Sequence, residues 1–352
     1  MDIKLRPLEE QVIVVTGATS GIGLATARLA AKRGARVVLV SRDKSDLKKA
    51  VRAIQKDGGE ATYSVADVGD MDELRSAAEH AVKEFGGIDT WINNAGVSIY
   101  GRIEEVPLED ARRLFETNYW GMVHGSLLAA EHLREHGGAL INVGSVVSDR
   151  AIPLQGHYSA SKHAIKGFTD ALRMELEEEG APISVTLVKP SSIDTQYPQH
   201  ARNLMDREPS FPPPVYSPRV VAKTILRCAE RPVRDITVGA GGGVLAGMGK
   251  LAPRLTDRYM ESSLFEQQKS DEPTPAKRRD ALHRPRKGDL AERGDYPGHV
   301  AKSSAYTGAK LHPIRTMLAV AALGAGVAIA LRGGDGLGGG IGEGSGDWTA
   351  RD

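Results

Sequence analysis

Tyr158 and Lys162 stand four positions apart in the stretch Tyr-Ser-Ala-Ser-Lys. On a helix, positions i and i+4 lie one turn apart on the same face, so the phenol and the ammonium could meet at one substrate atom. A lysine about 4 Å from a phenolate contributes about 4 kcal/mol at an effective dielectric constant near 20. Because about 1.4 kcal/mol corresponds to one pKa unit, a tyrosine pKa near 10 could fall to about 7, where general acid–base catalysis is most effective. The same spacing also occurs by chance in ordinary surface pairs. The surrounding elements must therefore show whether Tyr158 and Lys162 form a catalytic pair or a surface pair.

A glycine-rich stretch follows the first expected strand. Residues 11–16 are a β-branched run, Gly17 to Gly23 follow it, and residues 24–33 have helical apolar spacing. The order strand, glycine-rich turn and helix is typical of a dinucleotide-binding site. Glycine permits the tight turn and the close approach of a pyrophosphate, and the helix N-terminus presents free N–H groups with a partial positive charge. A plain strand-to-helix turn is the alternative.

The second expected strand, residues 35–40, ends at Ser41, Arg42 and Asp43. In a dinucleotide-binding fold this end faces the adenosine ribose, where an acid would hold the 2′-hydroxyl and an arginine a 2′-phosphate. Arg42, with Ser41 in the place of an acid, favours NADP over NAD. The adjacent Asp43 keeps NAD as the alternative.

Helical and strand-like stretches alternate along the chain, which predicts βαβ units and an α/β fold: a Rossmann-type, doubly wound parallel sheet with helices on both faces. Ligands of such sheets bind beyond the carboxyl ends of the strands. Asp67, the turn Asn93–Gly96 and Ser145 each follow an expected strand. Helices are expected over 44–56, 70–85, 107–136 and 220–229, and further strands over 61–66, 88–93, 138–143, 183–189 and 235–238.

Motifs in this order resemble those of the short-chain dehydrogenase/reductase family. They are Thr16-Gly17-x-x-x-Gly21-Ile22-Gly23, Asn93-Asn94-Ala95-Gly96, Asn118, Ser145 and Tyr158-x-x-x-Lys162, and the resemblance covers roughly residues 8–250. It implies that Tyr158 is the general acid–base and that Ser145 binds the substrate oxygen. Lys162 would lower the tyrosine pKa and hold the nicotinamide ribose, while Asn118 would keep a water that links the lysine to solvent.

The resemblance also implies a cofactor site. Asp67 and Val68 match the adenine-binding pair, and Asn94 would lie near the adenosine. After the sixth strand the family usually has Pro-Gly, whereas this chain has Pro190-Ser191, and serine lacks the conformational freedom of glycine. The expected cofactor-binding residues are Gly17, Thr19, Ser20, Gly21, Ile22, Gly23, Ser41, Arg42, Asp67, Val68, Asn94, Ala95, Gly96, Tyr158, Lys162, Pro190, Ile193 and Thr195.

Composition excludes several other classes of function. A formal net charge of +1, with dispersed basic residues, argues against nucleic-acid binding. The single cysteine, Cys228, rules out an intramolecular disulfide, and no His/Cys cluster has metal-ligand spacing, so no metal is expected. The first ten residues are not a secretory signal peptide, which predicts a cytoplasmic protein.

A long loop and an extension surround the expected core. Residues 196–214, with Tyr197 and three successive prolines, have the length of a substrate lid. Apolar side chains at Val146, Val147 and Leu154 suggest an apolar pocket. The expected organisation is a catalytic domain over 1–240, helices covering the pocket over 241–265, an extended or disordered polar linker over 266–312, a short apolar helix over 313–332, and a flexible glycine-rich tail over 333–352.

The apolar helix has two interpretations. Met317 to Leu331 contains no charge, and its length of about 22 Å is less than the roughly 30 Å of a bilayer core. With its flanking residues it could cross or embed in a membrane, or it could be buried against protein.

These features predict an NADP-dependent oxidoreductase that interconverts an apolar carbonyl compound and a secondary alcohol. A cofactor-binding regulatory protein and a membrane-tethered scaffold, both without turnover, are the alternatives. The resemblance also implies a homo-oligomer, a dimer or tetramer, that pairs through the helices bearing Asn118 and Tyr158.

Overall fold

The computed structural model describes residues 3–312 and 316–317. Residues 1–307 form one compact unit, and residues 308–352 belong to a second. The expected boundary after residue 240 falls within the first unit, which also holds the expected pocket-covering helices and most of the expected linker.

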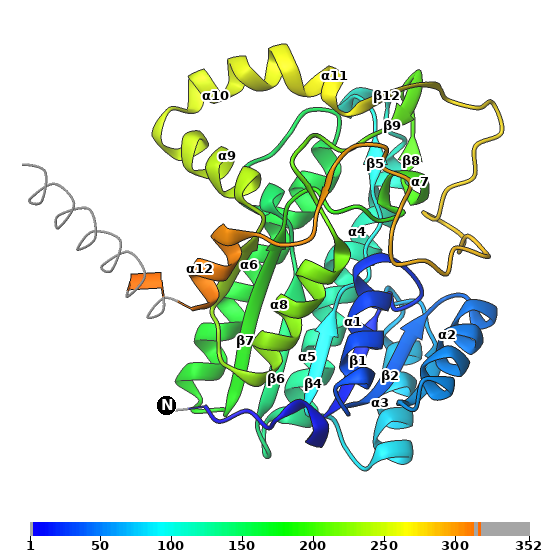
Figure 1. The fold of residues 1–352 in the computed structure, drawn as a ribbon, viewed down its shortest axis with the longest axis vertical. Coiled ribbons are helices and arrows are strands. Elements are labelled where there is room, and N and C mark those ends of the chain that lie inside the picture. The colour runs from blue at the N-terminus through cyan, green and yellow to red at the C-terminus, as the bar shows by residue number, and fades with distance from the viewer. Residues whose placement is uncertain (1–2, 313–315, 318–352) are drawn as a thin grey trace, which may run out of the picture. The chain divides into compact units, whose positions relative to one another are not determined.

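A seven-stranded parallel sheet forms the centre of the first unit (Figure 1). The strand order β11-β7-β6-β4-β1-β2-β3 reverses between β1 and β4, which creates the crevice where ligands of doubly wound sheets bind. The predicted α/β fold is confirmed. The strands are β1 (Val12–Thr16), β2 (Arg36–Ser41), β3 (Glu60–Val65), β4 (Thr90–Asn93), β6 (Gly138–Val143), β7 (Ile183–Pro190) and β11 (Asp235–Val238).

Helices cover both faces of this sheet (Figure 1). On one face, α1 lies beside α2 and α8. On the other, Leu74 of α3, Leu128 of α5 and Leu172 of α6 share a buried apolar cluster with alternate β1 residues, as the two-residue period of a strand requires. The helices are α1 (Gly21–Lys32), α2 (Lys44–Lys56), α3 (Met71–Phe85), α4 (Leu108–Phe115), α5 (Gly121–Leu133), α6 (Gly156–Glu178) and α8 (Pro218–Glu230).

The helix expected over 107–136 is interrupted. A π-helical turn, Glu116–Trp120, separates α4 from α5 and contains Asn118. Such turns insert one extra residue into a helix and are frequent at functional sites. Apolar periodicity does not reveal this insertion, because the flanking helices continue the same pattern.

The extension packs on the core and is not the disordered linker that its composition suggested. Strand β12 pairs antiparallel with β9, inside the loop 196–214, and β13 pairs with β10, which directly follows this loop. These smaller elements are β5 (Ile99–Tyr100), α7 (Tyr197–His200), β8 (Arg202–Asn203), β9 (Arg207–Pro209), β10 (Val215–Tyr216), α9 (Ala240–Leu251), α10 (Pro253–Tyr259), α11 (Phe265–Gln267), β12 (Lys269–Pro273), β13 (Val300–Ala301) and α12 (Ala305–Leu311).

The expected apolar helix 313–332 lies outside the described residues, apart from 316 and 317, and so does the tail 333–352. Within the part of the chain that the structure describes, no helix has the length and apolar character needed to cross a membrane.

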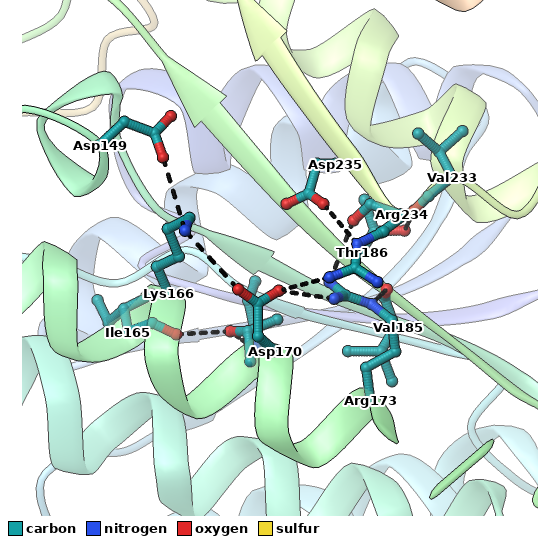
Figure 2. Close-up of polar contacts among 12 residues, drawn as sticks. Asp149, Ile165, Lys166, Asp170, Arg173, Val185, Thr186, Val233, Arg234 and Asp235 are labelled. Carbon is teal, nitrogen blue, oxygen red and sulfur yellow. Dashed lines mark hydrogen bonds and ion pairs between the residues drawn. The ribbon is translucent and has the colours of Figure 1, made fainter. Parts of the chain in front are cut away.

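Helix α6 carries Tyr158 and Lys162 near its N-terminus, and its C-terminal half is fixed to the sheet (Figure 2). The buried guanidinium of Arg173 donates to the carbonyl oxygens of Val185, at 2.9 Å, and Arg234, at 3.2 Å. It also pairs with Asp170 one turn away, at 2.8 Å. Three hydrogen bonds from one buried guanidinium hold the helix in position over β7.

Candidate active site

Ser145 and Tyr158 meet at the carboxyl end of β6. Ser145 directly follows the Gly144 turn after this strand, and its Oγ accepts a hydrogen bond from the Val147 amide at 3.2 Å. Tyr158 lies in the first turn of α6, and the hydroxyls of Tyr197 and Ser145 are near enough to oppose, in part, the rise that burial causes in its pKa. The structure therefore brings the two expected catalytic hydroxyls together, and both line a cavity of about 730 Å³.

Lys162 lies behind the tyrosine ring. Its ammonium is 5.6 Å from the ring centre of Tyr158 and donates to the carbonyl oxygen of Val143 at 3.0 Å. The side chain is almost completely buried, and this desolvation lowers the pKa of Lys162 to about 8. The lysine therefore lines the same cavity in an environment that weakens its charged form.

The expected fall in the Tyr158 pKa is wrong for this structure. Burial of the phenol raises the pKa of Tyr158. The sequence argument placed a solvated ammonium beside the hydroxyl, whereas the lysine here is itself desolvated and bonded to a backbone carbonyl. Burial therefore disfavours the charged form of each group, although a lysine with a pKa of about 8 is still mostly charged at neutral pH.

Asn118 links three parts of the site. Its Oδ1 accepts from the Val97 amide at 2.8 Å, while its Nδ2 donates to the Val97 carbonyl at 3.0 Å and to Ser161 Oγ at 3.1 Å. The π-helical turn thus ties the β4 loop to α6. Asn118 is also close to the lysine, since a Cβ on Gly96 would lie 3.4 Å from Asn118 Oδ1 and 3.9 Å from Lys162 Nζ.

The glycine-rich turn has the geometry of a phosphate-binding turn. Gly17 and Gly21 have positive φ angles, 65° and 53°. A Cβ on Gly23 would lie 2.2 Å from the Gly17 carbonyl oxygen, so only glycine fits there. Asn94 holds the turn from the β4 side, because its Nδ2 donates to the carbonyl oxygen of Thr16 at 2.9 Å.

The adenosine end of the crevice is covered by the extension. Arg42 donates to the carbonyl oxygens of Ala281 and Leu282, and the carboxylate of Asp67 pairs with Arg113. Nearby, the expected cofactor residues Thr19 and Ser41 hydrogen-bond each other at 3.1 Å, and Val68 and Ala95 pack into the apolar core.

Ala291, further along the extension, accepts from the Gly21 amide at 2.9 Å. Sequence reasoning did not find these partners, because the extension is polar and distant in the chain. Ser20, at the N-cap of α1, makes no side-chain cap bond.

Comparison with known proteins identifies the family. Residues 11–205 match the family described as short chain dehydrogenase. YxnA, an uncharacterized oxidoreductase of Bacillus subtilis, is 43% identical over 324 residues, which is 91% of each chain. The chain belongs to the short-chain dehydrogenase/reductase family. The match to YxnA is longer than the family match, so it takes in much of the chain beyond residue 205.

Two solved structures share the fold. A short-chain dehydrogenase/reductase from Burkholderia phymatum in complex with NAD has a TM-score of 0.61 at 23% identity, and the match covers 77% of this chain and 100% of that chain. An alcohol dehydrogenase from Thermococcus sibiricus complexed with 5-hydroxy-NADP has a TM-score of 0.58 at 24% identity, covering 65% of this chain and 95% of the other. Both of these structures carry a nicotinamide dinucleotide or an analogue of one.

The departure from the usual Pro-Gly of short-chain dehydrogenases causes no backbone strain. Among the described non-glycine residues only Leu154 has a positive φ, so Ser191 needs no left-handed conformation. The Ser191 amide donates to the Val238 carbonyl at 2.9 Å, and its hydroxyl lines the cavity without a partner. Pro190, Ile193 and Thr195 line the same wall.

The substrate side of the cavity is largely apolar. Val146 and Val147 line it as expected, but Leu154 packs instead against Tyr100. The extension closes the opposite side with α9 and the residues that follow it: Val244, Leu245, Met248, Tyr259 and Leu264. Across the part of the chain that the structure describes, no group of three acidic, histidine or cysteine side chains could hold a metal ion.

Proposed function

We propose that this protein is an NADP-dependent oxidoreductase that interconverts a carbonyl compound and a secondary alcohol. The observation that carries the proposal is the convergence of the Ser145 and Tyr158 hydroxyls in one cavity, with Lys162 buried behind them. A protein that only bound a dinucleotide would need neither hydroxyl at that place.

Each residue of the site has a distinct role in the proposed reaction. Bound nicotinamide supplies or accepts the hydride. Ser145 holds the substrate oxygen, and Tyr158 gives that oxygen a proton in reduction or removes one in oxidation. Lys162 and Asn118 hold the cofactor ribose and the proton path to solvent. The apolar wall excludes water from this step and favours an apolar substrate.

The preference for NADP rests on Arg42 at the end of β2. Its planar guanidinium suits a 2′-phosphate, and Ser41 leaves no carboxylate at that position to hold a ribose hydroxyl. Asp67 lies 3.9 Å from Arg42 and shares its charge with Arg113, which leaves the region positive.

The decisive test is NADPH consumption against aldehydes and ketones graded in chain length and ring size, with Tyr158→Phe alongside. Turnover by the wild type that is lost in the Tyr158→Phe variant supports the enzyme. Rates that rise with chain length support the apolar pocket. Tight NADPH binding without turnover in either direction would instead favour a regulatory cofactor-binding protein.

Two further parts of the proposal concern partners. A homodimer through α5 and α6 is supported by large exposed apolar side chains on or next to these helices: Trp120 in the π-helical turn before α5, Leu127 on α5 and Met174 on α6. Light scattering of Leu127→Glu tests the dimer, since this variant is expected to be a monomer.

The proposal also includes membrane attachment through residues 313–332 of an otherwise cytoplasmic protein. Fractionation of cells that express the chain without residues 313–352 tests this attachment.

A further inference from the structure

Residues 288–294 of the extension, here called the strap, connect the start of α2 with the loop after β7. At one end, the Gly288 amide donates to the buried carboxylate of Asp46, in the first turn of α2, at 2.9 Å. At the other end, Arg293 pairs with the completely buried carboxylate of Asp194, in the loop after β7, at 2.5 Å. Because α2 follows β2 in the chain, both anchors lie at the carboxyl ends of strands. The strap therefore spans the crevice of the parallel sheet.

The middle of the strap contacts the glycine-rich turn. The carbonyl oxygen of Ala291 accepts from the amide of Gly21 at 2.9 Å. Gly21 is the first residue of α1, so its N–H is one of those at the helix start that have no partner within the helix. Phosphate oxygens of dinucleotides bind such N–H groups. The strap oxygen therefore takes a hydrogen-bond donor that a cofactor phosphate would use.

The strap has no buried side chain. None of the residues 283–299 is buried, whereas Leu282, just before them, is completely buried in an apolar cluster with Leu114 of α4. Segments without buried apolar contacts open at a low free energy. The extension can therefore stay attached at Leu282 while the strap leaves the turn.

Ion pairs at the middle of the strap add to the contacts at its two ends. Glu292 pairs with Arg28 of α1 at 3.1 Å and with Arg219 of α8 at 2.8 Å. The two arginine side chains are 37% and 71% exposed, and ion pairs of exposed groups contribute little to stability. A pyrophosphate carries full negative charges, whereas the Ala291 carbonyl carries only a partial one. The pyrophosphate is therefore the stronger acceptor for the N–H groups of the turn.

We propose that the strap is a gate on the dinucleotide site: it occupies the glycine-rich turn in the free protein and must leave it before NADPH binds. The apparent Kd is then the intrinsic Kd divided by the fraction of open protein, so a weaker strap gives tighter binding. A strap that clasped the bound cofactor would have the opposite effect, since weakening it would weaken binding. This inference rests on the proposed function in one respect, that the glycine-rich turn binds the dinucleotide.

The test compares the Kd of NADPH for the full chain and for its Gly288→Ala variant, by fluorescence titration. Gly288 has a φ of 83°, and nothing lies within 4 Å of the position of an added Cβ. Alanine therefore strains the closed strap without a clash or a change of charge. The Kd is expected to fall by about fivefold, the factor by which a Cβ in the left-handed region disfavours the closed form. Gly86→Ala is the matched control, because Gly86, at the end of α3, has a φ of 85° and the same open space.

Glu292→Gln weakens the strap by a different route. It removes the ion pairs with Arg28 and Arg219 but keeps the size of the side chain, and the Kd of NADPH is expected to fall by about threefold. Glu230→Gln is its control. It makes the same change of charge in an ion pair with Arg33, 3.0 Å long, at the opposite ends of α8 and α1. Its Kd should stay that of the wild type.

Trypsin reports the position of the strap in the wild type. NADPH is expected to accelerate cleavage after Lys287 and Arg293, identified by mass spectrometry, because bound cofactor keeps the strap off the turn. Protection of these sites by NADPH would overturn the inference, and so would a Kd that Gly288→Ala and Glu292→Gln leave unchanged or raise. Failure of the proposed function looks different, because the wild type would then bind NADPH without any Tyr158-dependent turnover. The two failures are therefore distinguishable in the same set of proteins.

Discussion

The guanidinium of Arg42 donates a hydrogen bond to the carbonyl oxygen of Leu282 at 3.2 Å, although the two residues are 240 positions apart. A second bond runs to the carbonyl of Ala281 at 2.5 Å. The extension thus holds this arginine at the adenosine end of the crevice. A guanidinium has five N–H donors, so these two bonds leave donors for a phosphate.

Arg42→Leu is expected to weaken NADPH binding by about 10- to 100-fold, because a charged hydrogen bond contributes about 1.5–3 kcal/mol. NADH lacks the 2′-phosphate, and its affinity should change by less than about threefold. Titration calorimetry of both cofactors measures the difference. Lys44→Leu, at an exposed position two residues later, is the control. Equal losses for NADPH and NADH would contradict the assignment of Arg42 to the 2′-phosphate.

The sheet, and the strand ends at which the candidate site residues lie, could be predicted because they depend on local patterns. β-Branched runs gave the strands, and the turn after each strand gave Ser145 and the Asn93–Gly96 loop. Asn118 was identified only through a motif, since its π-helical turn leaves no trace in the apolar periodicity. The direction of the Lys162 ammonium could not be predicted. A buried ammonium needs a hydrogen-bond acceptor, and here the acceptor is the carbonyl oxygen of Val143.

The extension was misjudged because its composition resembles that of a disordered segment. It has few apolar residues, but Leu282 is completely buried against the core. Its charges find partners on the core, as in the ion pairs of Glu292 with Arg28 at 3.1 Å and of Arg293 with Asp194 at 2.5 Å. Composition counts charges but does not show which of them are paired at a distance.

Gly23→Ala is expected to abolish dinucleotide binding and to destabilise the fold. The added Cβ would lie 2.2 Å from the Gly17 carbonyl oxygen, so the turn and the start of α1 must move apart. Gly87→Ala is the matched control, because nothing lies within 4 Å of its Cβ. Thermal melting with and without NADPH measures both effects. An unaltered NADPH-induced rise in Tm for Gly23→Ala would show that the cofactor binds elsewhere.

Arg173→Met should lower the free energy of unfolding by about 3 kcal/mol, because it leaves buried carbonyl oxygens without a donor. Lys166→Met, on the same helix, removes a half-exposed lysine whose carboxylate contacts are 3.8 and 3.9 Å long. It should cost less than about 1 kcal/mol. Urea denaturation of both variants gives the comparison, and similar losses would mean that the network of Figure 2 does not anchor α6.

Lys162→Met should stabilise the protein at neutral pH even though it removes a proposed catalytic group. Burial lowers the pKa of Lys162 from 10.5 to about 8. Below pH 8 the lysine is charged in both the folded and unfolded states. Burial of the charged lysine then lowers the free energy of unfolding by the full desolvation cost, about 3 kcal/mol. Loss of the bond to Val143 offsets about 1 kcal/mol of the gain.

Between pH 8 and 10.5 the folded protein releases its Lys162 proton while the unfolded chain keeps it, so the wild type gains stability as pH rises. The advantage of Lys162→Met should therefore shrink through this window and reverse above it, where only the lost hydrogen bond remains. Thermal melting across this pH range, with Lys166→Met as a half-exposed control on α6, follows the change. A difference in Tm that stays constant with pH would mean that Lys162 keeps an ordinary pKa in the folded protein.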